Sequence, residues 1–223
     1  MDTVLSSASK QVVIGPGQPF CIIGERINPT GRKAFQHELR AGDLSRVETD
    51  VAQQVAGGAM VLDVNMGTPL ADEAELMTRA VRLIQGLTDL PLVIDSSIIE
   101  VAAGQYEIGV EDIVIDPLAM PVGADTGHGI RTLETIALLR EEFGVNMTLG
   151  ASNVSFGMPD RHTIGAGFLP MAISHGLTSA IMDARAPQIV RAVKAADLLL
   201  DQDPWGASWI AAHRAQQAQR AAT

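Results

Sequence analysis

Short runs of apolar residues recur along the chain, and each is followed by a stretch with the period of an amphipathic helix. The runs are continuous rather than alternating, as expected of strands that are buried on both faces. Six of them stand out, at residues 20–23, 60–64, 92–94, 113–115, 147–149 and 180–182. Strands that alternate with helices predict an α/β fold whose parallel strands are joined by right-handed crossovers.

The intervening stretches have recognisable helix ends. The first has apolar residues at helical spacing between the candidate N-cap Asp43 and the Gly57-Gly58 pair, and a later one begins at Pro187. Residues 1–19 lack any periodicity and predict a flexible arm, residues 20–210 the barrel domain, and residues 211–223 a helical tail. Trp205 and Trp209, four apart, are expected on one face of a terminal helix.

Polar residues end nearly every predicted strand. A TIM barrel builds its active site from such a ring at the carboxyl ends of its strands, whereas an open sheet concentrates the residues at one switch point. Any one of them also fits an N-cap of the following helix. The whole set favours a barrel: Glu25, Asn28, Asp63, Asn65, Asp95, Ser96, Asp116, Ser152, Asn153 and Asp183.

The composition of the chain argues against several classes of function. The 223 residues carry a net charge of −10, which argues against a nucleic-acid partner. No segment approaches the roughly 18 uncharged apolar residues of a membrane span, and residues 1–20 do not have the pattern of an export signal. Cys21 is the sole cysteine, so a cytoplasmic location is expected. Dinucleotide and P-loop motifs are absent, and the five histidines form no metal-binding pair.

Residues 24–31 read Gly-Glu-Arg-Ile-Asn-Pro-Thr-Gly. This segment resembles the opening motif of the methyltetrahydrofolate:corrinoid methyltransferases, the family that includes the folate domain of cobalamin-dependent methionine synthase. Residues 62–65, 94–97, 112–118 and 150–157 resemble the strand-end motifs of that family in the same order, as do 168–172 and 176–181. The resemblance covers residues 20 to 205.

The resemblance implies a TIM-barrel fold that binds the pterin of methyltetrahydrofolate in its mouth. It also implies transfer of the N5 methyl group to the cobalt of a corrinoid (cobalamin) carried by a partner protein, and a homodimer. Carried over to this chain, it makes Asn153 the catalytic residue at N5. The same resemblance gives the substrate-binding residues Asp95, Asp116, Arg161, Glu25, Asn65 and Ser155, and no metal ligand.

The residue types suit this chemistry. A pterin presents an exocyclic amine beside a ring N–H, so one aspartate carboxylate can accept both hydrogen bonds, and Asp116 is the first choice for that role. A tertiary amine leaves poorly unless N5 gains positive character. The amide oxygen of Asn153 can accept a hydrogen bond from protonated N5, which favours the transition state over the ground state.

The spacing of the motifs departs from the family at one place. Leu92 and Asp112 are 20 residues apart, whereas Met60 and Leu92 are 32 apart. The family has two more strand–helix units here, including an asparagine that contacts the pterin, and residues 101–111 resemble the start of one family helix joined to the end of another. Gly165 is a smaller departure, at a position where the family commonly has asparagine. Six strands do not close a barrel with the usual stagger, so the sheet closes differently, two copies complete one another, or the chain is a deletion product.

Three alternatives stay open. Dihydropteroate synthase has the same fold, yet residues 66–69 and 152–154 lack the cations that its pyrophosphate substrate requires. A non-catalytic pterin-binding or corrinoid-docking protein is the second alternative, and transfer of methyl to free cob(I)alamin would distinguish it from an enzyme. A zinc enzyme is the third and is the least supported by the histidine spacing.

Overall fold

The computed structural model describes residues 2–69, 71–95 and 114–221. Its central parallel sheet has the order β5-β4-β3-β8, formed by β3 (Cys21–Ile27), β4 (Val61–Val64), β5 (Leu92–Ile94) and β8 (Ser179–Met182). Two further parallel strands, β6 (Val114–Ile115) and β7 (Asn146–Met147), pair with each other. A parallel bridge from Gly150 to Ile181 and a hydrogen bond of 2.9 Å from the Ile181 N–H to the Leu149 carbonyl connect the segment after β7 to β8.

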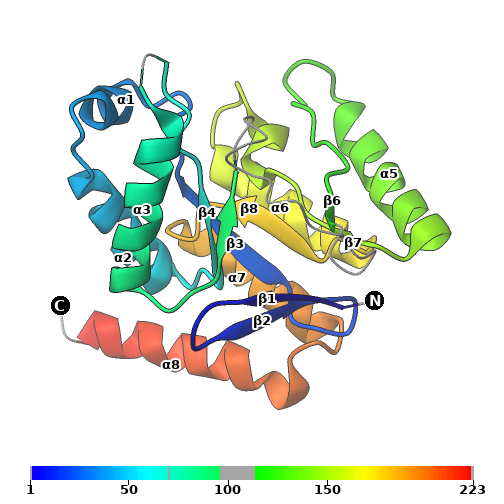
Figure 1. The fold of residues 1–223 in the computed structure, drawn as a ribbon. Coiled ribbons are helices and arrows are strands. Elements are labelled where there is room, and N and C mark those ends of the chain that lie inside the picture. Colours follow the sequence, from blue (N-terminus) through cyan, green and yellow to red (C-terminus); the bar gives the residue numbers. More distant parts are fainter. Residues whose placement is uncertain (1, 70, 96–113, 222–223) are drawn as a thin grey trace.

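The strands therefore follow one another as an arc in the order β5-β4-β3-β8-β7-β6, with helices on its outer side (Figure 1). In the described ranges, β5 and β6 are the two edges of this arc. The prediction of an α/β, TIM-barrel-like fold is confirmed. Ser96, the proposed junction at 101–111 and residue 113 of the predicted fourth strand lie outside the described residues.

The helices bury the apolar stripes that the sequence predicts. In α3 (Glu73–Leu87), Leu76, Ala80 and Ile84 face the core, and the Asp72 carboxylate caps the helix by accepting the Glu75 N–H at 3.0 Å. Pro187 opens α7, and Gly58 ends α2 with a φ of 99°, a conformation that favours glycine. The longer helices are α1 (Lys33–Arg40), α2 (Ser45–Gly57), α3 (Glu73–Leu87), α5 (His128–Phe143), α6 (Arg161–Ser174), α7 (Pro187–Leu199) and α8 (Ala207–Ala221).

Two apolar clusters lie on opposite faces of the strands. Ile22, Leu62 and Met182 belong to the large cluster that packs against the helices. Their chain neighbours Ile23 and Val61 belong to a smaller cluster on the inner face, and Ile181 packs against it. Successive side chains of a strand point to opposite faces, which produces this separation.

The inner cluster includes residues from the N-terminal segment, which forms an antiparallel hairpin of β1 (Thr3–Ser6) and β2 (Gln11–Ile14). Val12 and Ile14 are buried against Cys21 and Ile23. The sequence suggested a loose arm here, and the difference arises because the contacts that order the hairpin come from distant residues. Asn146 is one of them, since its Nδ2 donates to the Ile14 carbonyl at 2.8 Å.

The expectation for the two tryptophans is wrong. Trp205 lies in the short 3₁₀ turn η3 (Pro204–Gly206) with a φ of 61° and is 98% exposed, whereas Trp209 is half-buried in α8. The Asp203 carboxylate accepts the N–H groups of Ser208 and Trp209, each at 2.9 Å, and so starts a new helix after the turn. None of the helices described is long and apolar enough to cross a membrane.

Candidate active site

The inner face of the sheet changes from apolar to acidic toward the carboxyl ends of its strands. Ile23, Val61, Val93 and Ile181 belong to or pack against the inner apolar cluster. Two residues further along each strand comes a carboxyl group, in the order β3, β4, β5, β8: Glu25, Asp63, Asp95 and Asp183. Because side chains alternate with a period of two, Glu25, Asp63 and Asp95 continue the inner face into the barrel mouth, whereas the Asp183 carboxylate is bound by Gln54 of α2 at 3.2 Å.

The Asp95 carboxylate is held by Asn65, which follows the neighbouring strand β4. The Asn65 Nδ2 donates to the Asp95 Oδ2 at 3.0 Å, and the Asn65 Oδ1 accepts the Gly67 N–H at 2.9 Å. The second bond fixes the orientation of the amide, so its NH₂ group faces Asp95. The structure thus brings together two predicted site residues, and it leaves the Asp95 side chain exposed in the mouth.

Glu25 connects this group to the segment after β7. Burial raises the pKa of Glu25, and the negative charge of Asp183 adds to the effect, while a hydrogen bond with Ser152 and the charges of Arg26 and Arg161 oppose it. Glu25 therefore lies within electrostatic reach of Arg161, another predicted site residue.

Arg161 is fixed in turn by the 3₁₀ turn η2 (Ala151–Ser155). Its Nη2 donates to the Ser152 carbonyl at 2.7 Å and its Nε to the Ser155 Oγ at 3.3 Å. Its guanidinium carbon also lies 5.7 Å from the centre of the exposed Phe156 ring. Glu25, Ser155 and Arg161 are thus linked through Ser152, and the side chain of Asn153 is exposed in the same turn.

Asp116 stands apart from the other predicted residues. It is exposed just after β6, and its Oδ1 accepts the Leu118 N–H at 2.8 Å. Across the described ranges, no hydrogen bond joins it to another predicted site residue. Its position after β6 still places it at the carboxyl ends of the strands.

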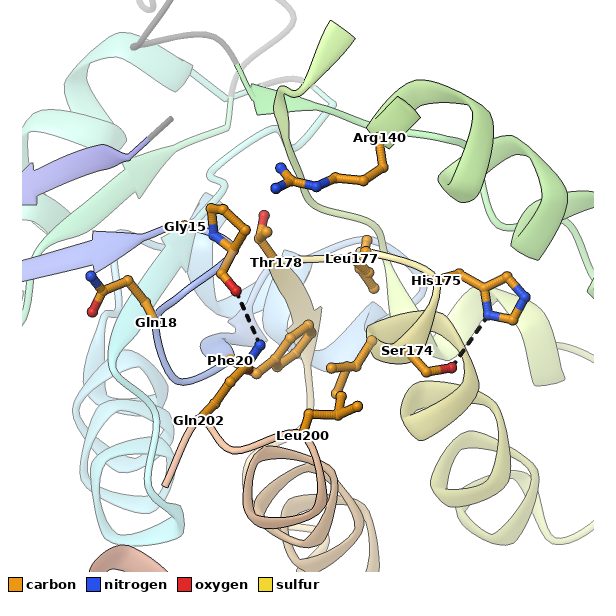
Figure 2. Close-up of a pocket in the computed structure, with 13 residues that line it drawn as sticks. Gly15, Gln18, Phe20, Arg140, Ser174, His175, Leu177, Thr178, Leu200 and Gln202 are labelled. Atoms are coloured by element: carbon orange, nitrogen blue, oxygen red, sulfur yellow. Dashed lines mark hydrogen bonds between the residues drawn. The ribbon is translucent and has the colours of Figure 1, made fainter. Parts of the chain in front are cut away.

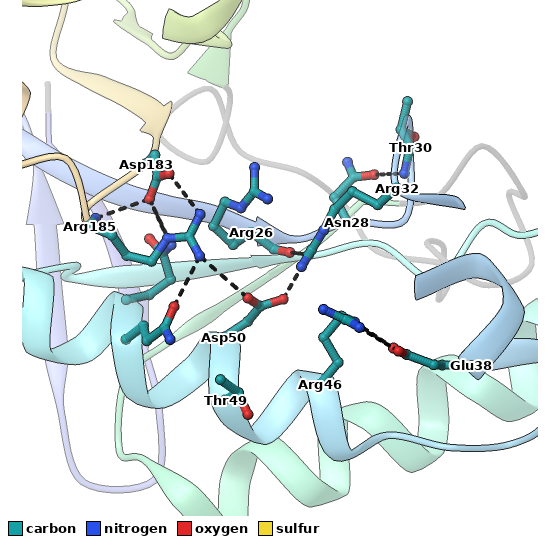
Figure 3. A network of polar contacts seen from close by, with 12 residues as sticks. Arg26, Asn28, Thr30, Arg32, Glu38, Arg46, Thr49, Asp50, Asp183 and Arg185 are labelled. Carbon is teal, nitrogen blue, oxygen red and sulfur yellow. Dashed lines mark hydrogen bonds and ion pairs between the residues drawn. The ribbon is translucent and has the colours of Figure 1, made fainter. Parts of the chain in front are cut away.

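A polar network behind the mouth holds Asp183 in its ionised form (Figure 3). Burial opposes ionisation, but hydrogen bonds from the side chain and backbone of Arg185 and from Gln54 outweigh it and lower the Asp183 pKa to about 2. Arg185 also lies 3.8 Å from Asp50, and Asp50 pairs with Arg32 at 2.7 Å. The network joins α2, the segment after β8 and the residues preceding α1.

Asp63 differs from the other carboxyls of the mouth. It is 2% exposed, and its Oδ1 has no hydrogen-bond partner among the described residues. Burial, assisted by the charges of Asp95 and Glu25, raises its pKa to about 7. The sequence marked Asp63 only as a polar strand end. Asp63 lies two residues after Val61 in the same strand, and this spacing predicts that both side chains face the inner side of the sheet.

Comparison with known proteins decides the family. The sequence matches the family described as "Pterin binding enzyme" over residues 24–111 and 102–183. The chain belongs to this family.

Among curated relatives, the chain is similar to a methylcorrinoid:tetrahydrofolate methyltransferase of Eubacterium limosum. The two are 25% identical over 159 residues, which cover 69% of this chain and 58% of the relative. The chain therefore spans less than two thirds of that relative's length.

Solved structures of dihydropteroate synthases share the fold. The enzyme of Xanthomonas albilineans in complex with 7,8-dihydropteroate superposes with a TM-score of 0.60 at 15% identity, covering 88% of this chain and 98% of the other. The Coxiella burnetii enzyme in complex with pteroic acid gives a TM-score of 0.62 at 12% identity, covering 90% and 99%. At these identities the similarity shows the fold alone.

Two pockets lie outside the ring of predicted site residues. One, of about 340 Å³, lies where β3 and β8 begin and is lined by Phe20, Arg140 and Thr178 among others (Figure 2). Another, of about 610 Å³, lies between α2, α7 and α8 in the outer layer. No group of three metal-ligating side chains is found in the part of the chain that the structure describes.

Proposed function

We propose that this protein transfers the N5 methyl group between methyltetrahydrofolate and the cobalt of a corrinoid protein. The similarity to the methylcorrinoid:tetrahydrofolate methyltransferase carries this proposal. The acidic inner mouth supports it, because a pterin offers adjacent N–H donors that carboxylates accept. Corrinoid is the substrate group carried by the partner protein.

In this proposal Asp95 and Asp116 accept hydrogen bonds from the pterin. Asn65 holds the Asp95 carboxylate in place through its 3.0 Å hydrogen bond, which reduces the entropy lost on binding. Residues Glu25, Ser155 and Arg161 line the opposite part of the mouth, and Arg161 is already oriented by its bonds to η2.

Asn153 acts at the reacting atom. When the N5–methyl bond breaks, N5 retains the electron pair, so protonation of N5 makes the leaving amine more stable. The side-chain oxygen of Asn153 accepts the hydrogen bond from protonated N5, and the exposed position of Asn153 in η2 leaves its amide free to turn. The proton comes from solvent.

A methyl-transfer reaction fits the sequence around the mouth better than dihydropteroate synthesis. Residues 66–69 and 152–154 contain no lysine or arginine to bind a pyrophosphate. The likeness to dihydropteroate synthases is a likeness of fold, so it does not favour that reaction.

The test combines binding and turnover. The purified chain is titrated with methyltetrahydrofolate by calorimetry, and methyl transfer to free cob(I)alamin is then followed by absorbance. We expect saturable binding and transfer, and we expect Asp116→Asn to weaken binding by about tenfold or more. Binding without transfer would favour a non-catalytic pterin-binding or corrinoid-docking protein, and no binding by a folded sample would contradict the proposal.

We further propose that the protein is a cytoplasmic homodimer. Burial raises the pKa of the Cys21 thiol to about 12, which keeps it unreactive in a reducing compartment. Sedimentation equilibrium of the purified chain tests the dimer, and a monomer at micromolar concentration would contradict it.

A further inference from the structure

Asp63 is a buried carboxyl group in the barrel mouth. It lies on the inner face between the apolar cluster that includes Val61 and the exposed carboxylate of Asp95. The Asp63 Oδ1 is buried without a hydrogen bond among the described residues. A buried polar atom left unpaired destabilises the folded state, so a ligand is the natural source of the missing partner.

The groups that face Asp63 are acidic. Asp95 at the end of β5 and Glu25 on β3 both act on it electrostatically, and no cation of the described ranges contributes. The nearby cations are occupied with other groups: Arg161 with η2 and Arg185 with Asp183. Arg26 acts on Glu25. An ionised Asp63 would therefore place a second negative charge beside Asp95 without a cation to compensate it. This favours the protonated form of Asp63.

We propose that Asp63 is a further substrate-binding residue, which as a neutral carboxylic acid donates a hydrogen bond to an acceptor atom on the ring edge that Asp95 binds. This inference rests on the proposed function and deepens it. A neutral carboxylic acid has one O–H donor, whereas the ionised form has only acceptors.

The chemistry of a pterin matches a pair of unlike carboxyl groups. The edge with the ring carbonyl, the ring N–H beside it and the exocyclic amine is the one assigned to Asp116. On the other side of the amine, the ring nitrogen N1 is an acceptor and lies beside the N8–H donor. The Asp95 carboxylate accepts from N8–H, and the Asp63 O–H donates to N1. Two ionised carboxylates would leave N1 facing a negative charge, so the protonation of Asp63 selects this ring edge.

The test measures the affinity for methyltetrahydrofolate by calorimetry between about pH 6 and pH 9, above the range in which unperturbed carboxyl groups titrate. For the wild type we expect constant affinity up to the Asp63 pKa of about 7 and a loss approaching tenfold per pH unit above it. In Asp63→Asn the amide NH₂ replaces the acid as a donor. That variant should bind within about threefold of the wild type at pH 6 and show no loss at higher pH.

Asp197→Asn is the matched control. Asp197 is also a buried aspartate whose pKa burial raises, but its Oδ1 accepts the Phe20 N–H at 3.0 Å at the opposite end of the strands. This variant should keep the wild-type affinity and pH profile. Asp63→Ala, which lacks a donor, should bind at least about tenfold more weakly than the wild type at pH 6.

The outcomes separate this inference from the proposed function. Binding by the wild type with a pH profile that Asp63→Asn does not change would overturn the role of Asp63 alone. Equal weakening by Asp63→Asn and Asp63→Ala at pH 6 would do the same. No binding by the folded wild type at any pH would overturn the proposed function and this inference together.

Discussion

The Asn65 amide and the Asp95 carboxylate, on neighbouring strand ends, are joined by a hydrogen bond of 3.0 Å. The other end of the amide accepts the Gly67 N–H, so Asn65 cannot rotate without losing both bonds. Asp95 thereby gains a fixed orientation although its side chain is exposed. A carboxylate that is oriented in this way is suited to bind a ligand, unlike a surface carboxylate that is free to rotate in solvent.

Asn65→Ala should therefore weaken binding of methyltetrahydrofolate while leaving the fold intact. Loss of one hydrogen bond that holds a ligand group costs about 1 kcal/mol, or roughly fivefold in affinity. Calorimetric titration measures it, with Thr78→Ala on the outer helix α3 as the control that keeps wild-type affinity. Unchanged affinity in Asn65→Ala would show that Asp95 needs no support.

Asn153→Ala should reduce methyl transfer far more than binding. Its proposed hydrogen bond strengthens only as N5 gains a proton, so about a hundredfold loss of the transfer rate is expected with nearly unchanged affinity. Single-turnover transfer to cob(I)alamin and calorimetry on the same preparation give the two values. Equal losses in rate and affinity would contradict a role in the transition state.

Asp63→Asn should change how the stability of the ligand-free protein depends on pH. The pKa of Asp63 is raised to about 7 in the folded state, so the folded state retains a proton that the unfolded state releases. The stability contributed by that proton is complete below the unfolded pKa of about 4 and is lost as the pH rises through 7. Relative to the wild type, the variant should become more stable by several kcal/mol between about pH 4 and pH 8.

Urea unfolding at both pH values measures this difference. The Asn side chain does not titrate, so only the wild type contains the Asp63 contribution, and Thr78→Ala, which removes no titrating group, is the control that keeps the wild-type pH dependence. A stability difference that is the same at both pH values would show that Asp63 is ionised in the folded state.

Asp50→Ala should strongly destabilise the fold. The Asp50 carboxylate is almost fully buried and lies 2.7 Å from Arg32 and 3.8 Å from Arg185 (Figure 3). Its removal leaves two guanidinium groups without this counter-charge, which costs about 3 kcal/mol. Glu38→Ala removes the ion pair with the more exposed Arg46 and should change the urea midpoint only slightly. Similar midpoints for both variants would contradict the structural role of Asp50.

The sequence by itself determined the order of the elements and where the polar residues lie along them. Continuous apolar runs and helical periods are local patterns, and burial acts on each of them directly. This is why all six predicted strands and the apolar stripe of α3 are present. The same patterns placed Asn65 and Asp95 at successive strand ends, which the parallel sheet then brought together.

Only the tertiary structure decided what depends on residues far apart in the chain. The N-terminal hairpin is ordered by Asn146, more than 130 residues after Ile14, and Arg185 lies beside Asp50 from another strand–helix unit. The protonation of Asp63 likewise depends on burial and on charges from two other strands. Local sequence patterns encode the secondary structure, whereas burial and electrostatics are properties of the assembled packing.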